Sequence, residues 1–377
     1  MLAKTHDNLH REVQWHCLPQ GVLLNMNTLI IKVDEQKLKP EELESAAQLL
    51  REGGLVAFPT ETVYGLGANA LDASAARKIY EAKGRPSDNP LIVHISEVSD
   101  IEILARDIPE KAYELAKVFW PGPLTIILKK KDCVPYGTTG GLDTVAIRLP
   151  ANLIARSLIA GSGVFVAAPS ANISGKPSPT KAEHVIKDMS GKIDMIIDGG
   201  MATLGLESTI IDLSGNVPVI LRPGCITKAM MENVIGPVEV DPVILSKNPD
   251  PSLAPKAPGM KYRHYAPEGK LTIYEGDTTR VIDAINHKAK EKLDSGKCVG
   301  IIATDETKAL YQYGTVKTIG SRKDENSIAA GLYAILREFD ELHMEYIYTE
   351  SFADNSLGHA IMNRLLKAAG YRIVKME

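Results

Sequence analysis

The apolar residues between positions 29 and 240 follow two periods, one typical of β-strands and one typical of α-helices. Apolar or alternating runs predict strands at Leu29–Val33, Leu55–Phe58, Leu91–Ile95, Leu124–Leu128, Thr144–Pro150, Val164–Ser170, Met195–Asp198, Ser208–Leu213 and Val217–Arg222. Apolar residues at helical spacing predict helices that begin near Pro40 and Pro109 and that span Asp72–Lys83, Thr180–Met189 and Thr227–Ile235. This alternation is typical of an α/β domain.

A second alternation follows a proline-rich stretch. Residues 242–260 contain five prolines and few apolar anchors, which predicts a semi-extended linker. Beyond it, strands are predicted at Leu271–Tyr274, Val299–Ala303, Val316–Ile319 and Tyr346–Thr349, alternating with helices of which Ser327–Phe339 and Leu357–Ala369 are the last two. This pattern predicts a smaller βαβ, Rossmann-like domain with a mostly parallel sheet.

A chain of 377 residues exceeds the usual size of a single core, so two domains are expected. We expect a disordered extension at 1–25, a first domain at 26–241, a linker that continues to 267, and a second domain at 268–377. The formal net charge of −4 gives no overall attraction to nucleic acid.

The cysteine spacing and the hydropathy of the chain indicate the cellular compartment in which the protein works. Cys17, Cys133, Cys225 and Cys298 lie far apart without paired spacing, which argues against a disulfide framework or a zinc site. No apolar run approaches the length of a membrane span. We therefore expect a cytoplasmic protein without a membrane partner.

Two predicted strands are followed by polar, glycine-containing segments that we interpret as ligand loops. Pro59–Gly67 follows the first, and Pro169–Ser178 follows the second, ahead of a helix that we expect to begin with a capping box of Thr180 and Glu183. Between them, Asp72 can cap a helix and Gly84 can end it. Lys83 and Arg85 would then lie at the end of that helix, next to the stiff turn 85–90.

Five separate segments offer groups that bind anions. They are Lys83 and Arg85; Arg148; Ser170, Asn172, Lys176 and Ser178; Arg222; and Lys261, Arg263 and His264. Phosphate is the expected ligand. Because the chain lacks a Walker loop, a GxGxxG motif, an HExxH motif and a nucleophile elbow, catalysis would depend on positioning and charge neutralisation, as phosphoryl and nucleotidyl transfers allow.

Several long motifs occur in a fixed order: PTETVYGLG at 59–67, KGRPSDNPL at 83–91, Ser170-x-Asn172, GLESTI at 205–210 and LRPG at 221–224. Together with PGMKYRHYAP at 258–267 and the extra βαβ domain, they resemble the threonylcarbamoyl-adenylate synthase family. Across residues 29–377 the chain is similar to its long two-domain form. Ala257 replaces the usual serine, which puts one linker hydroxyl contact in doubt, and Pro123 replaces a common alanine.

The resemblance implies a fold and a reaction. The fold is a YrdC-like catalytic domain with a twisted mixed sheet and flanking helices. The reaction converts L-threonine, bicarbonate or carbon dioxide, and ATP into threonylcarbamoyl-AMP, pyrophosphate and water. Mg²⁺ would be held mainly by the ATP phosphates, with its protein ligands unknown and no other cofactor expected. The product would serve threonylcarbamoylation of the adenosine beside the anticodon of tRNA by a downstream transferase machinery, without a required contact between this chain and tRNA.

The resemblance also implies roles for individual residues. The threonine-binding positions are Thr62, His94, Arg148, Ala168 and Ser208. The nucleotide-binding positions are Arg85, Asn89, Thr144, Ser170, Ser178 and Arg222. Lys83 and Arg85, with Ser170 and Asn172, would form the catalytic neighbourhood of bicarbonate and the α-phosphate. Lys261, Arg263, His264 and Tyr265 would form a lid over the pyrophosphate.

Other interpretations remain open on the residues alone. His94 would ordinarily be a satisfied core histidine and Arg148 a surface cation, while Glu61 and Asp88 are as well suited to capping turns as to binding Mg²⁺. The main alternative function is an RNA-binding or regulatory module that docks double-stranded RNA or tRNA in a basic concavity. It leaves the non-basic groups Thr62, His94 and Ser208 unexplained. Carbamoyl-adenylate chemistry for hydrogenase maturation would require further modules that the chain lacks.

Overall fold

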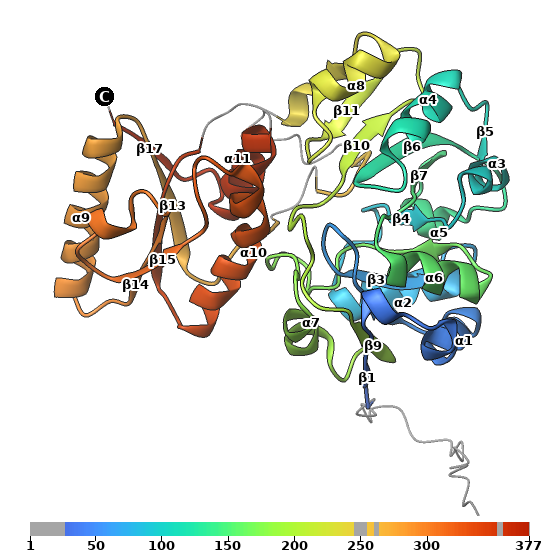
Figure 1. The fold of residues 1–377 in the computed structure, drawn as a ribbon, viewed down its shortest axis with the longest axis horizontal. Helices are drawn as coiled ribbons and strands as arrows, with labels where there is room; N and C mark the ends of the chain where they lie inside the picture. The colour runs from blue at the N-terminus through green and yellow to red at the C-terminus, as the bar shows by residue number, and fades with distance from the viewer. Residues whose placement is uncertain (1–26, 245–254, 260–263, 353–356, 377) are drawn as a thin grey trace, which may run out of the picture.

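The computed structural model describes residues 27–244, 255–259, 264–352 and 357–376, which form two sheets with helices on their faces (Figure 1). The first sheet ends at residue 240 and the second begins at residue 270. Within these ranges, no helix combines the length and the apolar character that crossing a membrane would need. The predicted α/β class is confirmed.

The first sheet has twelve strands and mixes parallel with antiparallel pairs. Its strands are β1 (Leu29–Lys32), β2 (Val56–Phe58), β3 (Gly65–Asn69), β4 (Ile92–His94), β5 (Ala105–Arg106), β6 (Leu124–Lys130), β7 (Thr144–Arg148), β8 (Val166–Ala167), β9 (Met195–Asp198), β10 (Thr209–Asp212), β11 (Val219–Arg222) and β12 (Glu239–Val240). Their order is β1-β9-β2-β3-β8-β4-β7-β6-β10-β11-β12, with β5 paired to β6.

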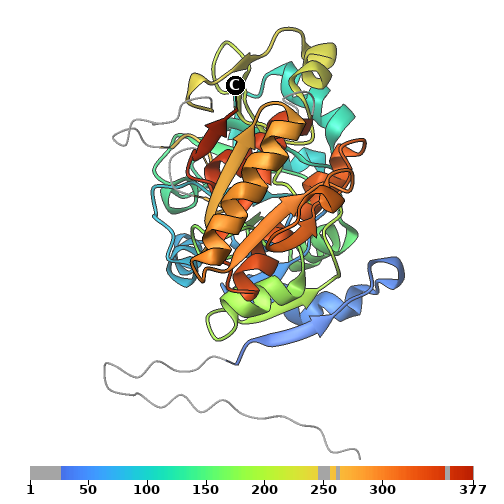
Figure 2. The ribbon, with the colours of Figure 1, turned by 90° about the vertical axis from the view of Figure 1, so that its left-hand side faces the viewer.

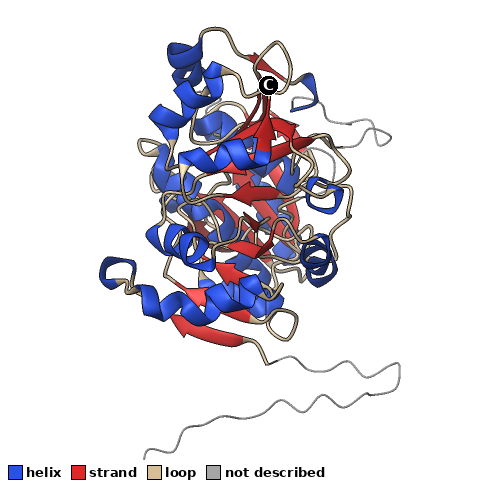
Figure 3. Ribbon diagram, turned by 90° about the vertical axis from the view of Figure 1, so that its right-hand side faces the viewer, coloured by secondary structure: helices blue, strands red, loops and turns tan. Residues whose placement is uncertain are grey.

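Helices cover both faces of this sheet (Figure 3). They are α1 (Glu44–Arg51), α2 (Ala73–Lys83), α3 (Ile101–Leu104), α4 (Glu110–Phe119), α5 (Tyr136–Thr139), α6 (Leu153–Ser162), α7 (Ala182–Met189) and α8 (Lys228–Ile235). Alternate residues of β2 divide between two apolar cores: Ala57 joins the core under α2, α4, α7 and α8, whereas Val56 and Phe58 join the core under α1 and α6. This division follows from the two-residue period of a strand and explains why β2 is buried throughout.

The pattern predicted a mostly parallel second sheet, and all the strand pairs of the described sheet are parallel. It has the order β15-β14-β16-β13-β17, formed by β13 (Lys270–Glu275), β14 (Val299–Ala303), β15 (Thr315–Thr318), β16 (Tyr346–Glu350) and β17 (Ile373–Lys375). Helix α9 (Thr278–Asp294) covers the outer face (Figure 2). Helices α10 (Glu325–Glu341) and α11 (Leu357–Ala368) cover the other face and lie between the two sheets (Figure 1).

The prediction of a ligand loop at Pro59–Gly67 is partly wrong, because its last three residues begin strand β3. Gly65 and Gly67 serve close packing there. A Cβ atom at Gly67 would come within 2.7 Å of Val166 Cγ1 and 2.8 Å of Phe58 Cε1. Glycine adds no apolar signal to a strand pattern, so a strand built around two glycines was interpreted as a loop.

Two further boundaries differ from the prediction. The expected capping box of Thr180 and Glu183 is absent, because α7 begins one residue later with Lys181 as its N-cap. The strand expected at Val164–Ser170 is regular only at β8, and beyond it single backbone hydrogen bonds and a bridge between Ser170 and Gly65 keep the chain beside β3 and β4. Helix α6 was not predicted.

His184 of α7 gives a prediction for the pH dependence of stability. Its Nδ1 accepts a hydrogen bond from the Thr180 backbone N–H at 3.2 Å, and burial lowers the pKa of its imidazole to about 3. Because the folded-state pKa lies below the unfolded value near 6.5, the unfolded chain binds the proton first as the pH falls. Folding therefore loses about 1.4 kcal/mol per pH unit below that value from this residue.

We expect His184→Asn, which keeps an acceptor near the position of Nδ1, to remove the contribution of this residue to the pH dependence of stability. The free energy of unfolding in urea should fall between pH 7.5 and pH 5.0 by about 2 kcal/mol less in the variant than in the unmodified chain. Comparing the two proteins cancels the contributions of the other titrating groups. An identical pH dependence in both would show that His184 is not held neutral by the fold.

Candidate active site

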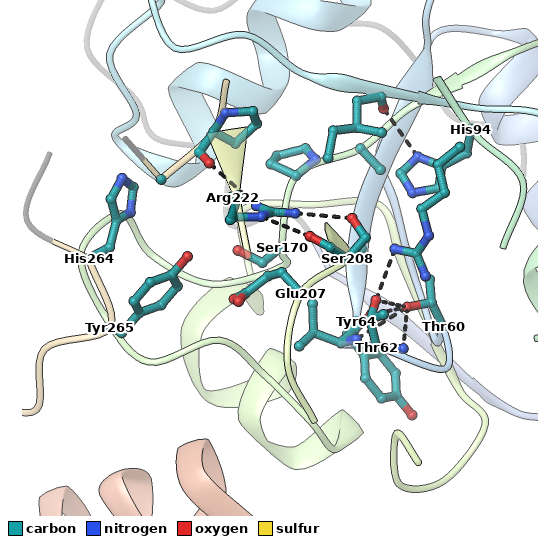
Figure 4. A pocket seen from close by; sticks show the side chains of 18 of the residues that line it. Thr60, Thr62, Tyr64, His94, Ser170, Glu207, Ser208, Arg222, His264 and Tyr265 are labelled. Carbon is teal, nitrogen blue, oxygen red and sulfur yellow. Dashed lines mark hydrogen bonds between the residues drawn. The ribbon is translucent and has the colours of Figure 1, made fainter. Parts of the chain in front are cut away.

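A cavity lies where several strands of the first sheet end, next to the described linker residues Pro258, Gly259, His264 and Tyr265 (Figure 4). Its lining comes from the segment between β2 and β3, the turn after α2, strands β4, β7 and β11, the segments after β8 and before β10, and the linker. The lining residues are Thr60, Thr62, Val63, Tyr64, Gly65, Arg85, Ile92, His94, Arg148, Ala168, Pro169, Ser170, Glu207, Ser208, Arg222, Pro258, Gly259, His264 and Tyr265. The fold thus brings together ten of the residues that the sequence singled out: Thr62, Arg85, His94, Arg148, Ala168, Ser170, Ser208, Arg222, His264 and Tyr265.

Arg148 occupies one side of the cavity in a fixed orientation. It ends β7, is only 4% exposed, and donates from Nη2 to Glu61 Oε1 at 2.7 Å and from Nη1 to Thr62 Oγ1 at 2.9 Å. Thr62 Oγ1 also lies 2.8 Å from Thr60 Oγ1. The guanidinium is therefore held in one orientation by a carboxylate and a hydroxyl, and each Nη keeps a second hydrogen that it can donate.

His94 stands beside Arg148, because β4 and β7 pair in parallel with these two residues in register. Its Nδ1 lies 3.1 Å from the Ile92 carbonyl oxygen. Burial, and then the charge of Arg148, lower the pKa of His94 to about 3. The imidazole is therefore neutral at physiological pH and adds a polar surface without a second cation.

Arg85 and Arg222 bring positive charge to the other side of the cavity. Arg222 donates from Nη2 to Ser208 Oγ at 3.1 Å and from Nε to Ser208 O at 3.0 Å, while Arg85 donates to the carbonyls of Asn89 and Pro90 at 3.3 and 3.2 Å. Among the described residues, no carboxylate forms an ion pair with either arginine. Burial lowers the pKa of both, that of Arg85 to about 10. The charge of Asp88 acts on Arg85 and that of Glu207 on Arg222, but neither carboxylate forms an ion pair with them. Two partly desolvated cations that are not held in an ion pair form a site for an anion.

Lys83 and Asn172 lie behind the cavity wall, outside its lining. Lys83 is 2% exposed, and its ammonium donates to the carbonyls of Ser170 and Asn172. Ser170 Oγ in turn donates to Asn172 Oδ1 at 2.5 Å. This arrangement holds the segment that presents Ser170 to the cavity. The catalytic roles of Lys83, Arg85, Ser170 and Asn172 stay predictions, and for Lys83 the geometry favours positioning over contact with a substrate.

Three expected nucleotide-binding residues also lie outside the lining. Thr144 begins β7, four residues before Arg148, so it lies about 13 Å away along the same strand. Asn89 is buried, and its carbonyl oxygen accepts a hydrogen bond from the Tyr80 hydroxyl at 3.3 Å. Ser178 donates to Glu207 Oε1 at 2.6 Å. Their roles in nucleotide binding stay predictions.

The linker forms one wall of the cavity. Lys261 and Arg263, two of the four expected lid residues, lie outside the described part of the chain. His264 and Tyr265 line the cavity (Figure 4), and their rings lie tilted by 38° with centroids 5.5 Å apart. Burial lowers the pKa of His264 to about 3, and its buried Nε2 has no hydrogen-bond partner among the described residues.

Glu207 is a cavity residue to which the sequence analysis assigned no role. It accepts hydrogen bonds from Ser178, from the Tyr333 hydroxyl at 2.9 Å and from Arg364 Nε at 2.8 Å. Burial alone would raise the pKa of this carboxyl, but Arg364 and Arg222 outweigh it and hold the pKa at about 2. Its place in the GLESTI motif could have indicated Glu207 as a site residue, whereas no local pattern indicated its partners on α10 and α11.

The described residues contain no group of three or more His, Cys, Asp or Glu side chains that could hold a metal ion. The carboxylate of Glu207, which lines the cavity, and that of Glu61, which contacts Arg148, are each bound by an arginine. The expectation of Mg²⁺ bound to ATP is not tested by this arrangement.

Comparisons with known proteins cover nearly the whole chain. A family model described as "Telomere recombination" matches residues 48–224, and a model described as "Threonylcarbamoyl-AMP synthase, C-terminal domain" matches residues 226–370. The chain is 51% identical to the threonylcarbamoyl-AMP synthase of Bacillus subtilis over 91% of its length and 97% of that protein. It is 50% identical to that of Pyrococcus abyssi over 93% of its length and the whole of that protein.

A solved structure shares the fold of both domains. It is the crystal structure of P. abyssi Sua5 in complex with L-threonine, with a TM-score of 0.87 and 49% identity. The match covers 93% of this chain and 100% of that one.

Proposed function

The chain belongs to the threonylcarbamoyl-AMP synthase family in its two-domain form, and from this membership we propose how its cavity performs the reaction. The enzyme makes L-threonylcarbamoyladenylate. We propose that it uses L-threonine, bicarbonate and ATP, and that it releases pyrophosphate. One observation supports this proposal most directly: the cavity contains an oriented arginine, Arg148, and two arginines that form no ion pair with a described carboxylate, Arg85 and Arg222.

The Arg148 side suits the amino-acid substrate. Because Glu61 and Thr62 each take one Nη hydrogen and hold the guanidinium in one orientation, the second hydrogen of each Nη would be available to a threonine carboxylate without rotation of the side chain. Neutral His94 and the Ser208 hydroxyl offer polar groups for the rest of the molecule, and the small Ala168 side chain leaves room for it. A crystal structure of the P. abyssi relative contains L-threonine, which supports threonine as the ligand here.

The Arg85 and Arg222 side suits the phosphates of ATP. In the proposed reaction, bicarbonate first carboxylates the amine of threonine with loss of water. The resulting carbamate oxygen then attacks the α-phosphorus as pyrophosphate leaves. No protein nucleophile is required. The two arginines and Ser170 would stabilise the negative charge that develops at phosphorus, which is an effect of preorganised donors. Mg²⁺ bound to the ATP phosphates would neutralise part of the remaining charge.

We further propose that the enzyme works in the cytoplasm, where its product would be passed to the machinery that modifies tRNA. The described cysteines, Cys133, Cys225 and Cys298, are unpaired, which suits a reducing compartment.

The alternative of an RNA-docking module is not favoured. Arg148 and Arg222 are 4% and 5% exposed, so the phosphates of a double helix could not reach them without opening the cavity. Recognition of double-stranded RNA uses exposed cations that span a broad surface.

Pyrophosphate release tests the proposed function. We expect release only when L-threonine, bicarbonate and ATP are all present, and the reactions that omit one component serve as controls. Release that did not depend on threonine and bicarbonate together would overturn the proposal. Salt-sensitive binding of RNA without any release would instead favour the alternative.

A further inference from the structure

We propose that Arg364 of the second domain is a positioning residue for the active site, which acts by holding Glu207 and, through it, Ser208 and Arg222. Arg364 lies on α11, within one of the two helices between the sheets (Figure 1), and it is 0% exposed. It does not line the cavity, so its effect on the reaction would pass through other residues.

The contacts of Arg364 reach two segments of the first domain that carry cavity residues. Its Nε donates to Oε2 of Glu207 at 2.8 Å, and Glu207 directly precedes Ser208 in the chain. Its Nη2 donates to the carbonyl of Pro223 at 2.8 Å, and Pro223 directly follows Arg222 in the chain. One planar guanidinium therefore connects the segment before β10 to the segment after β11, and its rigid fork fixes their separation.

These two segments also meet inside the cavity wall. Arg222 donates to both the carbonyl and the hydroxyl of Ser208, and that hydroxyl lies 2.7 Å from Thr125 Oγ1 on β6. A displacement of the Glu207 segment would therefore carry Ser208 and Arg222 with it. Because one of these residues faces each side of the cavity, the displacement would affect both proposed substrate sites.

The second domain also completes the binding of the Glu207 carboxylate. Tyr333 of α10 donates to the same oxygen as Arg364, and Ser178 donates to the other. A buried carboxylate that lost its arginine would be left without a countercharge in a low-dielectric interior, which is strongly unfavourable. The position of Glu207 thus depends on residues that follow it in the chain by more than a hundred positions.

Tyr333 and Arg364 also contact Tyr265, a linker residue that lines the cavity. The Tyr265 ring lies with its centroid 5.3 Å from that of Tyr333, and the Arg364 guanidinium carbon lies 5.8 Å from the Tyr265 ring centroid. Tyr265 lines the cavity, so Arg364 supports the linker as well as the two strand ends. The second domain consequently contributes to the shape of a site that it does not itself line.

The test compares Arg364→Gln with Arg337→Gln in the full chain. Arg337 of α10 is a matched control, because it is also a buried arginine that crosses the domain boundary and binds a carboxylate, Asp188, and a carbonyl, that of Pro177. None of its partners lines the cavity. We expect both variants to lower Tm, and only Arg364→Gln to lower kcat/KM for threonine in pyrophosphate release, by about 100-fold, as for a misplaced catalytic group.

Each protein is assayed at a temperature at which near-ultraviolet circular dichroism shows it folded. Arg337→Gln should stay within about threefold of the unmodified chain. Equal losses in both variants, or an unaffected Arg364→Gln, would overturn the proposal. Arg364→Lys, which restores the charge but cannot bridge both segments, should recover only part of the activity.

A double variant keeps the test decisive if Arg364→Gln alone does not fold. Glu207→Gln with Arg364→Gln removes both buried charges together, so its Tm should lie above that of the single variant. Its kcat/KM should nevertheless remain at least about tenfold below that of the unmodified chain, since neither amide spans the two segments. A double variant with nearly full activity would show that the pair only stabilises the interface.

The proposal rests on the proposed function for its readout. The threonine-induced rise in Tm, which needs no turnover, is therefore measured in parallel. An unmodified chain that shows this rise but no pyrophosphate release would refute the proposed reaction alone. Loss of the rise in Arg364→Gln but not in Arg337→Gln would still support the positioning role.

Discussion

Replacing Arg85 with alanine is expected to lower kcat/KM for pyrophosphate release by about two to three orders of magnitude, the cost of losing one preorganised donor at a developing charge. Arg85 lines the cavity, makes no ion pair with a described carboxylate, and faces the same side as Arg222. Its own hydrogen bonds, to two backbone carbonyls at 3.2 and 3.3 Å, are long. Removing the side chain should therefore affect the fold far less than the reaction.

Arg77→Ala provides the matched control. Arg77 is exposed on α2, the helix that ends just before Arg85, so the variant removes the same charge from the same region without touching the cavity. We expect the activity of Arg77→Ala to stay within about twofold of that of the unmodified chain. The Tm values of Arg85→Ala and Arg77→Ala should each fall by no more than a few degrees. If Arg85→Ala lost stability and activity in parallel, Arg85 would be part of the scaffold and not of the anion site.

The helix before Arg85 illustrates what the sequence could predict. Helix α2 ends as expected because local signals agree: Asp72 accepts a hydrogen bond from the Ser74 N–H at 2.8 Å, and Gly84 adopts the left-handed conformation with φ of 59°. Each signal lies within a few residues of the boundary that it marks. The position of Arg85 at the helix end was predictable for the same reason.

The cavity could be predicted in part. Motifs of the catalytic domain indicated most of its lining, since they stand at the ends of predicted strands. Arg364 had no such signal, because it lies in a helix among the apolar residues Ile361 and Leu365 and its partner Glu207 precedes it by 157 positions. Periodicity indicates which face of a helix is apolar, but it does not indicate that a buried arginine pairs with a carboxylate of another domain.

Thr144 shows a different limit of the pattern. Alternation correctly placed Thr144 and Arg148 on one strand, yet residues on the same face of a strand can lie at opposite ends of it. Four residues of extended chain separate them by about 13 Å, so only Arg148 reaches the cavity.

Substitution of Gly205 with alanine is expected to separate the two domains and to inactivate the enzyme. Gly205 has a φ of 72°, which disfavours any residue with a Cβ by about 1–2 kcal/mol. In addition, a Cβ atom there would lie 2.5 Å from Ala330 Cα and 2.7 Å from the Ala329 carbonyl oxygen, both backbone atoms of α10. Since neither atom can rotate away, α10 or the segment that leads to Glu207 has to move.

Either movement would disturb the contacts through which α10 and α11 hold the cavity wall. Tyr333 lies one turn of α10 beyond Ala329, and Glu207 follows Gly205 by two residues, so their hydrogen bond spans the point of the clash. We expect the free energy of unfolding to fall by more than about 3 kcal/mol, the sum of backbone strain and overpacking. At a permissive temperature, kcat/KM for pyrophosphate release should fall by about 100-fold.

Gly200→Ala separates the steric clash from the backbone strain. Gly200 has a similar φ of 83°, yet a Cβ atom there would meet no other atom within 4 Å. This variant should lose only about 1–2 kcal/mol of stability and keep its activity within twofold. Urea denaturation and pyrophosphate release measured on both variants make the comparison. If the two behaved alike, the close approach of Gly205 to α10 would have no energetic consequence, and the cavity wall would not depend on how the second domain docks.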